Sequence, residues 1–179
     1  MLFRSEPLRL PIKINTVGGK WYFDDMQEFP DTLQVSYEYS GKTPKILTYE
    51  MRIWAPYNME GESEGSALYG DKGYIIVGNS SWRAYGERGK VLAEAKGDSS
   101  EVPHVQDFLD CIKTRKKPFC DLETVGHPAS VLCHTGNISA RLGRQLILDP
   151  TTEMFIGDEA ANALRTRPEY RKPWTLPEV

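Results

Sequence analysis

The pattern of hydrophobic and polar residues along the chain changes its period once, near residue 100. Up to about residue 96, apolar and polar side chains alternate, which is the period of a half-buried β-strand. Residues 33–39 (LQVSYEY) are the clearest example. Glycine-containing turns separate several of these runs, so a series of hairpins is expected. The other predicted strands cover residues 12–17, 20–23, 46–54, 67–69, 74–77, 81–85 and 90–95.

From about residue 102 the apolar residues recur with the 3.6-residue period of an amphipathic helix. One helix is predicted to end before Pro118. A longer helix is predicted over residues 127–144, with Pro128 in its first turn and Gly143 close to its end. A short return strand over residues 145–148 and a short helix over residues 158–164 follow.

These elements predict an α+β fold with an open, mostly antiparallel β-sheet and helices on one face of it. We expect a ragged N-terminus over residues 1–10, a single domain over 11–165 and an extended C-terminal arm over 166–179. Both faces of the strands near residues 33–53 carry large side chains, and two helices can cover only one face. The other face would expose aromatic residues, so we expect a homo-oligomer that buries it, most simply a two-fold dimer.

Composition narrows the class of protein. The formal net charge of −3 gives no electrostatic reason to expect binding to nucleic acid or to an anionic membrane. The longest apolar runs are far shorter than a membrane span, and the first residues have no signal-peptide core. No CxxC motif is formed by the three cysteines, Cys111, Cys120 and Cys133. They are therefore expected to be free thiols in a reducing compartment, and we predict a cytoplasmic location.

The predicted helix over residues 127–144 carries a polar stripe between two packing faces. One of those faces consists of small residues around Gly136, spaced so that another backbone could approach closely. The stripe either faces a ligand or forms a hydrogen-bonded network that ties the helix to the sheet or the tail. Its members are Ser130, His134, Asn137 and Arg141.

The loop over residues 54–62 combines aromatic, amide and carboxylate side chains. Aromatic rings stack on the C–H faces of sugars and polar groups bind hydroxyls, so this mixture suits sugar recognition; a packed loop with incidental carboxylates is the alternative. The candidate substrate-binding residues are therefore Trp54, Tyr57, Glu60, His134, Asn137 and Arg141.

No catalytic, metal or cofactor site is predicted. His127 and His134 share a helix but lie two turns apart, too far for one ion without other ligands. Cys133 and His134 are adjacent on a helix, so they point about 100° apart and do not form a dyad. The sequence contains neither GxGxxG nor GxxxxGK[ST], so dinucleotide binding by a Rossmann mechanism is not expected of this chain.

The order of several short motifs resembles the C-terminal domain of the glucose–fructose oxidoreductase / inositol dehydrogenase / rhizopine-catabolism (Gfo/Idh/MocA) family. The resemblance runs from about Leu10 to Leu176. The motifs are residues 69–74 (YGDKGY), 104–112 (HVQDFLDCI), 126–128 (GHP), 133–144 (CHTGNISARLGR), 158–162 (DEAAN) and 170–174 (YRKPW).

This resemblance implies a substrate-binding and oligomerisation domain whose full-length relatives carry an N-terminal Rossmann domain for NAD(P). Those relatives move a hydride between nicotinamide and a sugar or polyol hydroxyl. The family's catalytic lysine, in its Glu-Lys-Pro motif, has no counterpart here, and its Asp/His pair would precede residue 1. No catalytic residue therefore carries over.

We accordingly expect a domain of an NAD(P)-dependent sugar or polyol oxidoreductase-like protein that cannot transfer hydride alone. A partner that supplies the Rossmann domain could restore the activity. Two alternatives stay open. One is a non-catalytic carbohydrate-binding or dimerisation module. The other is an NAD-independent sugar-processing enzyme with His134 as general base.

Overall fold

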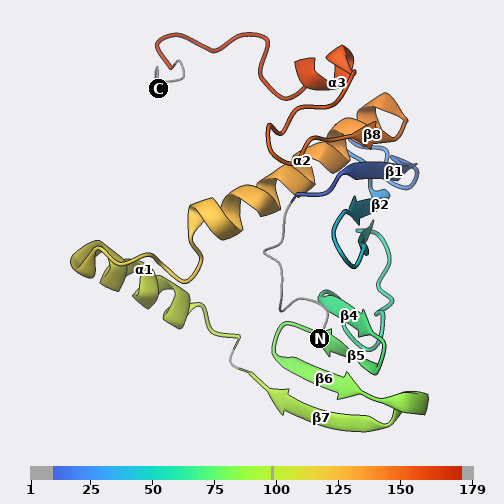
Figure 1. Cartoon of the computed structure of the whole chain (residues 1–179), viewed down its shortest axis with the longest axis vertical. Coiled ribbons are helices and arrows are strands. Elements are labelled where there is room, and N and C mark those ends of the chain that lie inside the picture. Colours follow the sequence, from blue (N-terminus) through green and yellow to red (C-terminus); the bar gives the residue numbers. More distant parts are fainter. Residues whose placement is uncertain (1–9, 98, 175–179) are drawn as a thin grey trace. The chain divides into compact units, whose positions relative to one another are not determined.

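The structure, a computed structural model, describes residues 10–97 and 99–174. These residues form two compact units. Residues 10–54 and 122–174 make up the first, which we call the helix-covered unit. Residues 55–97 and 99–121 make up the second, the hairpin unit. Figure 1 labels the elements of both.

The helix-covered unit contains a four-stranded antiparallel sheet in the order β3-β2-β1-β8. Its strands are β1 (Lys13–Gly19), β2 (Thr32–Tyr39), β3 (Lys45–Arg52) and the short β8 (Leu146–Ile147). The register pairs Ile14 with Tyr37 on one side and with Leu146 on the other. The return strand predicted after the long helix is thereby confirmed, and it extends the sheet beside β1.

The strand predicted over residues 20–23 is wrong. These residues form a loop, in which the backbone N–H groups of Trp21, Tyr22 and Phe23 donate to the carboxylate of Asp31. These N–H groups therefore donate to a buried carboxylate, whereas in a strand they would donate to the carbonyl groups of a neighbouring strand.

The helix α2 (His127–Leu142) packs along β1 on one face of this sheet (Figure 1). As predicted, a proline lies in its first turn, and Gly143 ends it in the left-handed conformation at φ 62°. The five-residue π-helical turn η2 (Leu122–Gly126) leads into it. The core beneath the helix consists of Ile14, Leu33, Val35, Tyr37, Ile138, Leu146, Leu148, Phe155 and Ala161.

The predicted close approach at the small-residue face of α2 is confirmed at Gly136. The Tyr37 hydroxyl donates to the carbonyl of Leu132 at 2.8 Å, and the Thr16 hydroxyl donates to that of Gly136 at 3.0 Å. A Cβ atom at position 136 would lie 2.7 Å from the Tyr37 hydroxyl oxygen and 3.4 Å from Val35. Glycine is therefore what allows the helix to lie this close to β2.

The short helix α3 (Glu159–Ala163) is fixed at its start by Asp158. This carboxylate accepts from the Ala161 N–H at 2.9 Å and forms an ion pair with Arg144. The hydrogen bond from Arg144, followed by the one from Ala161, lowers the pKa of Asp158 to about 2. The Asn162 amide bonds both the N–H and the carbonyl of Phe155. These contacts fix residues 155–162 to one another and to Arg144, just after the end of α2.

The hairpin unit contains a second four-stranded antiparallel sheet in the order β4-β5-β6-β7. Its strands are β4 (Ser66–Gly70), β5 (Gly73–Val77), β6 (Ser81–Tyr85) and β7 (Val91–Lys96), with the 3₁₀ turn η1 (Glu87–Gly89) before β7. The helix α1 (Val102–Thr114) follows. One of its faces is apolar, and the side chains on that face remain half exposed: Val105, Phe108, Leu109 and Ile112.

The two faces of the β4–β7 sheet differ in chemistry. One face carries a row of stacked tyrosines, Tyr69, Tyr74 and Tyr85, with ring centroids 5.3 and 4.7 Å apart. The strand register places most of the aliphatic residues and one tryptophan together on the other face, while Ala67 and Ile76 lie on the tyrosine face. That apolar face consists of Leu68, Ile75, Val77, Trp82, Ala84, Ala93 and Ala95.

The α+β class and the antiparallel pairing are confirmed, but the strands form two sheets rather than one. The expectation of aromatic residues on the uncovered face is wrong for the helix-covered unit. There, Tyr37 lies on the face beneath α2 together with its cross-strand neighbours, while the opposite face carries mainly polar residues such as Gln34 and Glu50. Residues 166–174 contain no helix or strand. The predicted ends over residues 1–9 and 175–179 lie outside the described residues, and the boundaries of the single domain stay a prediction.

Candidate functional site

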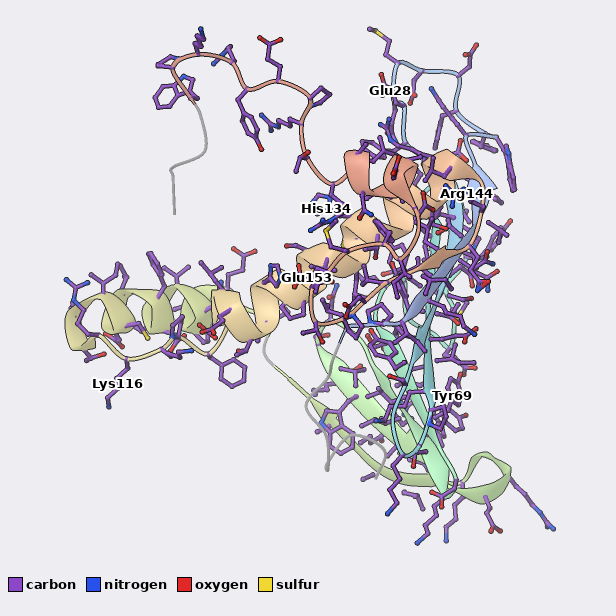
Figure 2. The ribbon with its side chains drawn as sticks, turned by 45° about the horizontal axis from the view of Figure 1, so that its top comes forward. Glu28, Tyr69, Lys116, His134, Arg144 and Glu153 are labelled. Atoms are coloured by element: carbon purple, nitrogen blue, oxygen red, sulfur yellow. The ribbon has the colours of Figure 1, made fainter. Side chains whose placement is uncertain are left out.

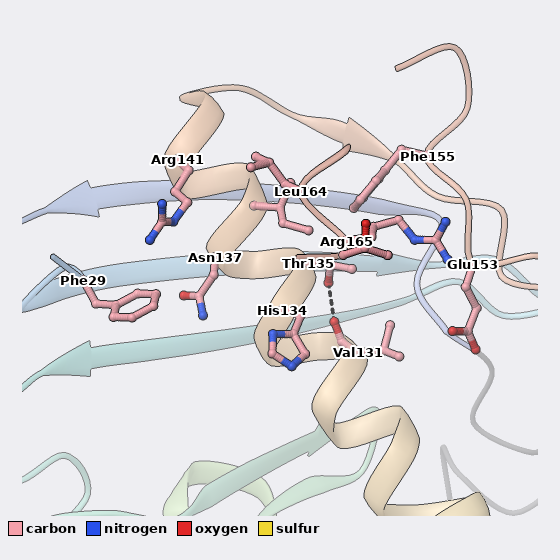
Figure 3. Close-up of a pocket in the computed structure, with 12 residues that line it drawn as sticks. Phe29, Val131, His134, Thr135, Asn137, Arg141, Glu153, Phe155, Leu164 and Arg165 are labelled. Atoms are coloured by element: carbon pink, nitrogen blue, oxygen red, sulfur yellow. Dashed lines mark hydrogen bonds between the residues drawn. The ribbon is translucent and has the colours of Figure 1, made fainter. Parts of the chain in front are cut away.

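A cavity of about 430 Å³ lies within the helix-covered unit, beside α2 (Figure 3). The helix forms one wall, and the opposite walls come from the loop before β2 and from the chain on either side of α3. The lining residues are Phe29, Val131, His134, Thr135, Asn137, Ile138, Arg141, Glu153, Phe155, Leu164, Arg165 and Thr166.

The wall formed by α2 contains three of the predicted stripe residues. His134, Asn137 and Arg141 follow one another along the same side of the helix, because residues three, four and seven apart share a helix face (Figure 3). The floor between them and α3 is apolar, with Ile138 and Phe155 both buried. The cavity therefore offers a row of hydrogen-bonding groups next to an apolar surface.

Arg141 is oriented by the loop before β2. Its guanidinium carbon lies 5.5 Å from the centroid of the Phe29 ring, a cation–π distance. Its Nη2 atom lies 3.4 Å from Oε2 of Glu28. Both contacts come from one short segment, so the position of this loop decides where the guanidinium points.

Asp31 holds that loop in place. Burial of this carboxylate acts to raise its pKa. The hydrogen bonds it accepts from the N–H groups of Phe23 and Tyr22, from the Thr32 hydroxyl and from the Trp21 N–H outweigh that effect, and the pKa falls to about 2. The side chain is fully buried, with 1% exposed. The ionised form is therefore the one the fold stabilises at neutral pH.

The far wall of the cavity has its own polar groups. Glu153 lies in the loop after β8, and its carboxylate contacts the imidazole of His127 at 2.6 Å. Figure 2 shows Glu153 and His134 on separate elements, the loop and α2. Arg165 contacts the sulfur of Met154. The cavity thus has basic groups at both ends and one carboxylate, which is already paired.

The comparisons with known proteins agree with this fold. A search of the curated proteins gave no match. A family described as "Oxidoreductase family, C-terminal alpha/beta domain" matches residues 81–176, more than half of the chain. The chain belongs to this family, the Gfo/Idh/MocA oxidoreductases.

Three solved structures of proteins described as oxidoreductases share the fold of most of this chain. The one from Thermotoga maritima has a TM-score of 0.57 at 13% identity, over 78% of this chain and 41% of its own length. The yvaA protein of Bacillus subtilis has a TM-score of 0.51 at 13% identity, over 78% and 47%. An oxidoreductase from Agrobacterium radiobacter, in complex with NAD⁺, L-tartaric acid and magnesium, has a TM-score of 0.52 at 13% identity, over 80% and 44%. This chain therefore spans less than half the length of these relatives.

The six candidate binding residues of this Gfo/Idh/MocA domain lie in three places. His134, Asn137 and Arg141 line one cavity. Trp54 instead stacks on Tyr22 at 5.2 Å and donates from Nε1 to the Thr32 hydroxyl at 2.8 Å, so its contacts are those of a packed side chain. Tyr57 and Glu60 belong to the other unit, where Tyr57 is 77% exposed and Glu60 occupies a turn at φ 53°.

Sequence reasoning missed the walls of the cavity that do not come from α2. Phe29 lies in a loop without periodicity, more than 100 residues before Arg141 in the chain. Arg165 follows directly after the predicted short helix, which was the one available signal for it. These missed residues are Phe29, Glu153, Phe155, Leu164, Arg165 and Thr166.

The residues described here do not fit NAD(P). All strand pairs within residues 10–97 and 99–174 are antiparallel, so this part of the chain has no parallel βαβ crevice of the dinucleotide-binding type. In the same ranges no three His, Cys, Asp or Glu side chains converge as they would around a metal ion. No helix of the described part combines the length and apolar character needed to cross a bilayer. All three cysteines are free thiols.

Proposed function

We propose that this chain is the substrate-binding and oligomerisation domain of an NAD(P)-dependent sugar or polyol oxidoreductase-like protein. The observation that carries the proposal is the row formed by His134, Asn137 and Arg141 along one wall of a cavity. An imidazole, an amide and a guanidinium together donate and accept hydrogen bonds in the way that neighbouring hydroxyls require. The apolar floor suits the C–H face of the same ligand.

The relatives support the part of the proposal that concerns NAD(P). The Agrobacterium radiobacter oxidoreductase was crystallised with NAD⁺, and this chain corresponds to 44% of its length. We propose that the cofactor is bound by a Rossmann domain outside the described residues, in this protein or in a partner chain. The free thiols agree with the cytoplasmic location that we propose.

Titration with a neutral polyol tests the binding role. We expect sorbitol to shift the NMR signals of His134 and Asn137, and we expect Asn137→Ala to weaken its binding because an amide donor and acceptor are lost. Ser130→Ala is the matched control. Ser130 lies on the same helix, but its hydroxyl donates to the Gly126 carbonyl at 2.9 Å and does not line the cavity. Shifts that map away from the cavity would refute the proposal.

The oligomerisation role rests on the apolar face of the β4–β7 sheet defined above. Its larger side chains are substantially exposed, with Leu68 at 41% and Trp82 at 37%. An apolar surface of this kind usually marks an interface, and a second copy of the chain is the partner we propose.

Light scattering at micromolar concentration tests this role. We expect a dimer mass for the wild type and a monomer mass for Ala93→Glu, since the new charge would be buried on the apolar face. Glu94→Gln is the control, because Glu94 lies on the opposite face, paired with Arg83. A monomer mass for the wild type would rule out the dimer.

A further inference from the structure

We infer that the ligand of the cavity carries an anionic group beside its hydroxyls and that Arg141 binds this group. The inference rests on the proposed sugar or polyol function and narrows its substrate class from neutral polyols to polyhydroxy acids or sugar phosphates. It follows from how Arg141 is held and from which of its contacts a ligand can replace.

The first step is the orientation of the guanidinium. Its carbon lies over the Phe29 ring at 5.5 Å. A guanidinium that stacks on an aromatic face keeps its N–H groups around its rim, where they match the geometry of a carboxylate or phosphate. The contact with Phe29 holds the guanidinium beside the ring without using its N–H groups. Apart from the one that faces Glu28, those N–H groups are available to an anion.

The second step is the identity of the group that contacts the Arg141 guanidinium in this structure. Glu28 lies at 3.4 Å, and its side chain is 80% exposed, against 51% for Arg141. Exposed ion pairs of this kind contribute little to stability. A ligand anion that enters the cavity can replace Glu28 at small cost, and Glu28 can turn to solvent. The glutamate thus behaves as an internal competitor for the anion.

The third step is the spacing of the neighbouring groups. Asn137 lies about 6 Å and His134 about 10 Å before Arg141 along the helix axis, from the rise of 1.5 Å per residue. An extended polyol acid whose carboxylate binds Arg141 would carry hydroxyls along this line. A ligand with an acidic group at one end and several hydroxyls matches the row better than a neutral polyol, because a carboxylate forms a bidentate ion pair with a guanidinium, whereas a hydroxyl accepts one hydrogen bond and carries no charge.

The fourth step is the net charge of the cavity. Arg141 and Arg165 both line it, and they come from different elements. The one lining carboxylate, Glu153, is contacted by His127 at 2.6 Å. The second arginine adds positive potential without competing for the same anion position, because Figure 3 shows it at the opposite end. The cavity as a whole therefore favours a negative ligand.

Isothermal titration calorimetry on the whole 179-residue chain tests the inference with three probes. Gluconate and sorbitol differ only at one terminal carbon, which is a carboxylate in the first and an alcohol in the second. Glucose 6-phosphate distinguishes a phosphate from a carboxylate. We expect gluconate or glucose 6-phosphate to bind about tenfold more tightly than sorbitol, because a carboxylate or phosphate can form a bidentate ion pair with the guanidinium and an alcohol cannot.

Two variants show whether Arg141 is responsible. Arg141→Gln should lower the affinity for the anionic probe about tenfold and that for sorbitol by a smaller factor, because the glutamine amide can still bond a hydroxyl but carries no charge. Glu28→Gln should raise the affinity for the anionic probe, because the competing carboxylate is removed. A purely structural role of the Glu28–Arg141 pair would instead weaken all probes together in both variants. Thermal unfolding followed by circular dichroism confirms that each variant folds.

The outcomes separate the two claims. Equal affinities for gluconate, glucose 6-phosphate and sorbitol would overturn the inference and leave the proposed polyol-binding function standing. A preference for an anion that persists in Arg141→Gln would overturn the role of Arg141. Binding of none of the three probes would overturn the proposed function and the inference with it.

Discussion

The two four-stranded sheets of this chain share antiparallel pairing and similar alternation of apolar residues, but they differ in burial. In the helix-covered unit, α2 lies on one sheet face, and Ile14, Val35 and Tyr37 are at most 3% exposed. Of the described residues 55–97 and 99–121, Ile76 is the single apolar side chain that is buried. The first unit has a core of its own, whereas the second has two sheet faces and an amphipathic helix whose apolar residues remain half exposed.

The difference teaches that a sheet becomes a stable layer only where a second layer covers it. The hairpin unit follows the same strand rules as its neighbour, but its apolar face and the apolar side of α1 still require partners. Much of its stabilisation is therefore expected to come from contacts outside the sheet. Three experiments examine this contrast, taken in order of decreasing expected effect.

The largest effect is expected in the core of the helix-covered unit. Phe155 is 2% exposed and packs with the other core residues, so Phe155→Ala should lower the free energy of unfolding by about 3–5 kcal/mol. Phe119→Ala is the control in the hairpin unit, where Phe119 is 90% exposed. It should change stability by no more than about 0.5 kcal/mol. Urea unfolding followed by circular dichroism measures both, and similar losses for the two variants would contradict the contrast.

A smaller loss is expected where the helix touches the sheet. Alanine is a better helix former than glycine by about 1 kcal/mol. Gly136→Ala should nevertheless destabilise the protein by about 1–3 kcal/mol, because its Cβ would lie 2.7 Å from the Tyr37 hydroxyl oxygen.

A double-mutant cycle locates the cause of that loss. Tyr37→Phe removes the hydroxyl, so Gly136→Ala should cost less when made in that background. Equal costs in the two backgrounds would show that the hydroxyl contact is not responsible.

The third experiment concerns pH: Asp31→Asn should destabilise the fold at neutral pH, because the amide nitrogen cannot accept the N–H groups that one carboxylate oxygen accepts now. The pKa of Asp31 is lowered in the fold from 3.8 to about 2, so its ionised form stabilises the fold above pH 3.8. That stabilisation is lost as the pH falls toward about 2. Melting temperatures should therefore differ between wild type and variant at pH 7 and converge in acid. Asp71→Asn, at an exposed hairpin tip, is the control. A melting-temperature difference between wild type and Asp31→Asn that did not change with pH would contradict the role of the ionised Asp31.

The candidate site was predictable only in part. Helix periodicity placed His134, Asn137 and Arg141 on one stripe, and the structure brings all three to one cavity. Trp54, Tyr57 and Glu60 were added to the candidate site because their side chains suit sugar binding. That criterion carries no information about whether they lie near the helix in space. Trp54 packs against Tyr22 instead, and the other two belong to the hairpin unit.

The sequence by itself determined the elements whose signals are local. Alternation predicted β2 and both hairpins of the β4–β7 sheet, and Pro128 and Gly143 marked the two ends of α2. Only the tertiary structure decided that the strands form two sheets, that Asp31 closes a loop where a strand was expected, and that Phe29 and Arg165 complete the cavity. The physical reason is that periodicity and capping act within a few residues, whereas these contacts depend on which distant segment finally lies nearest.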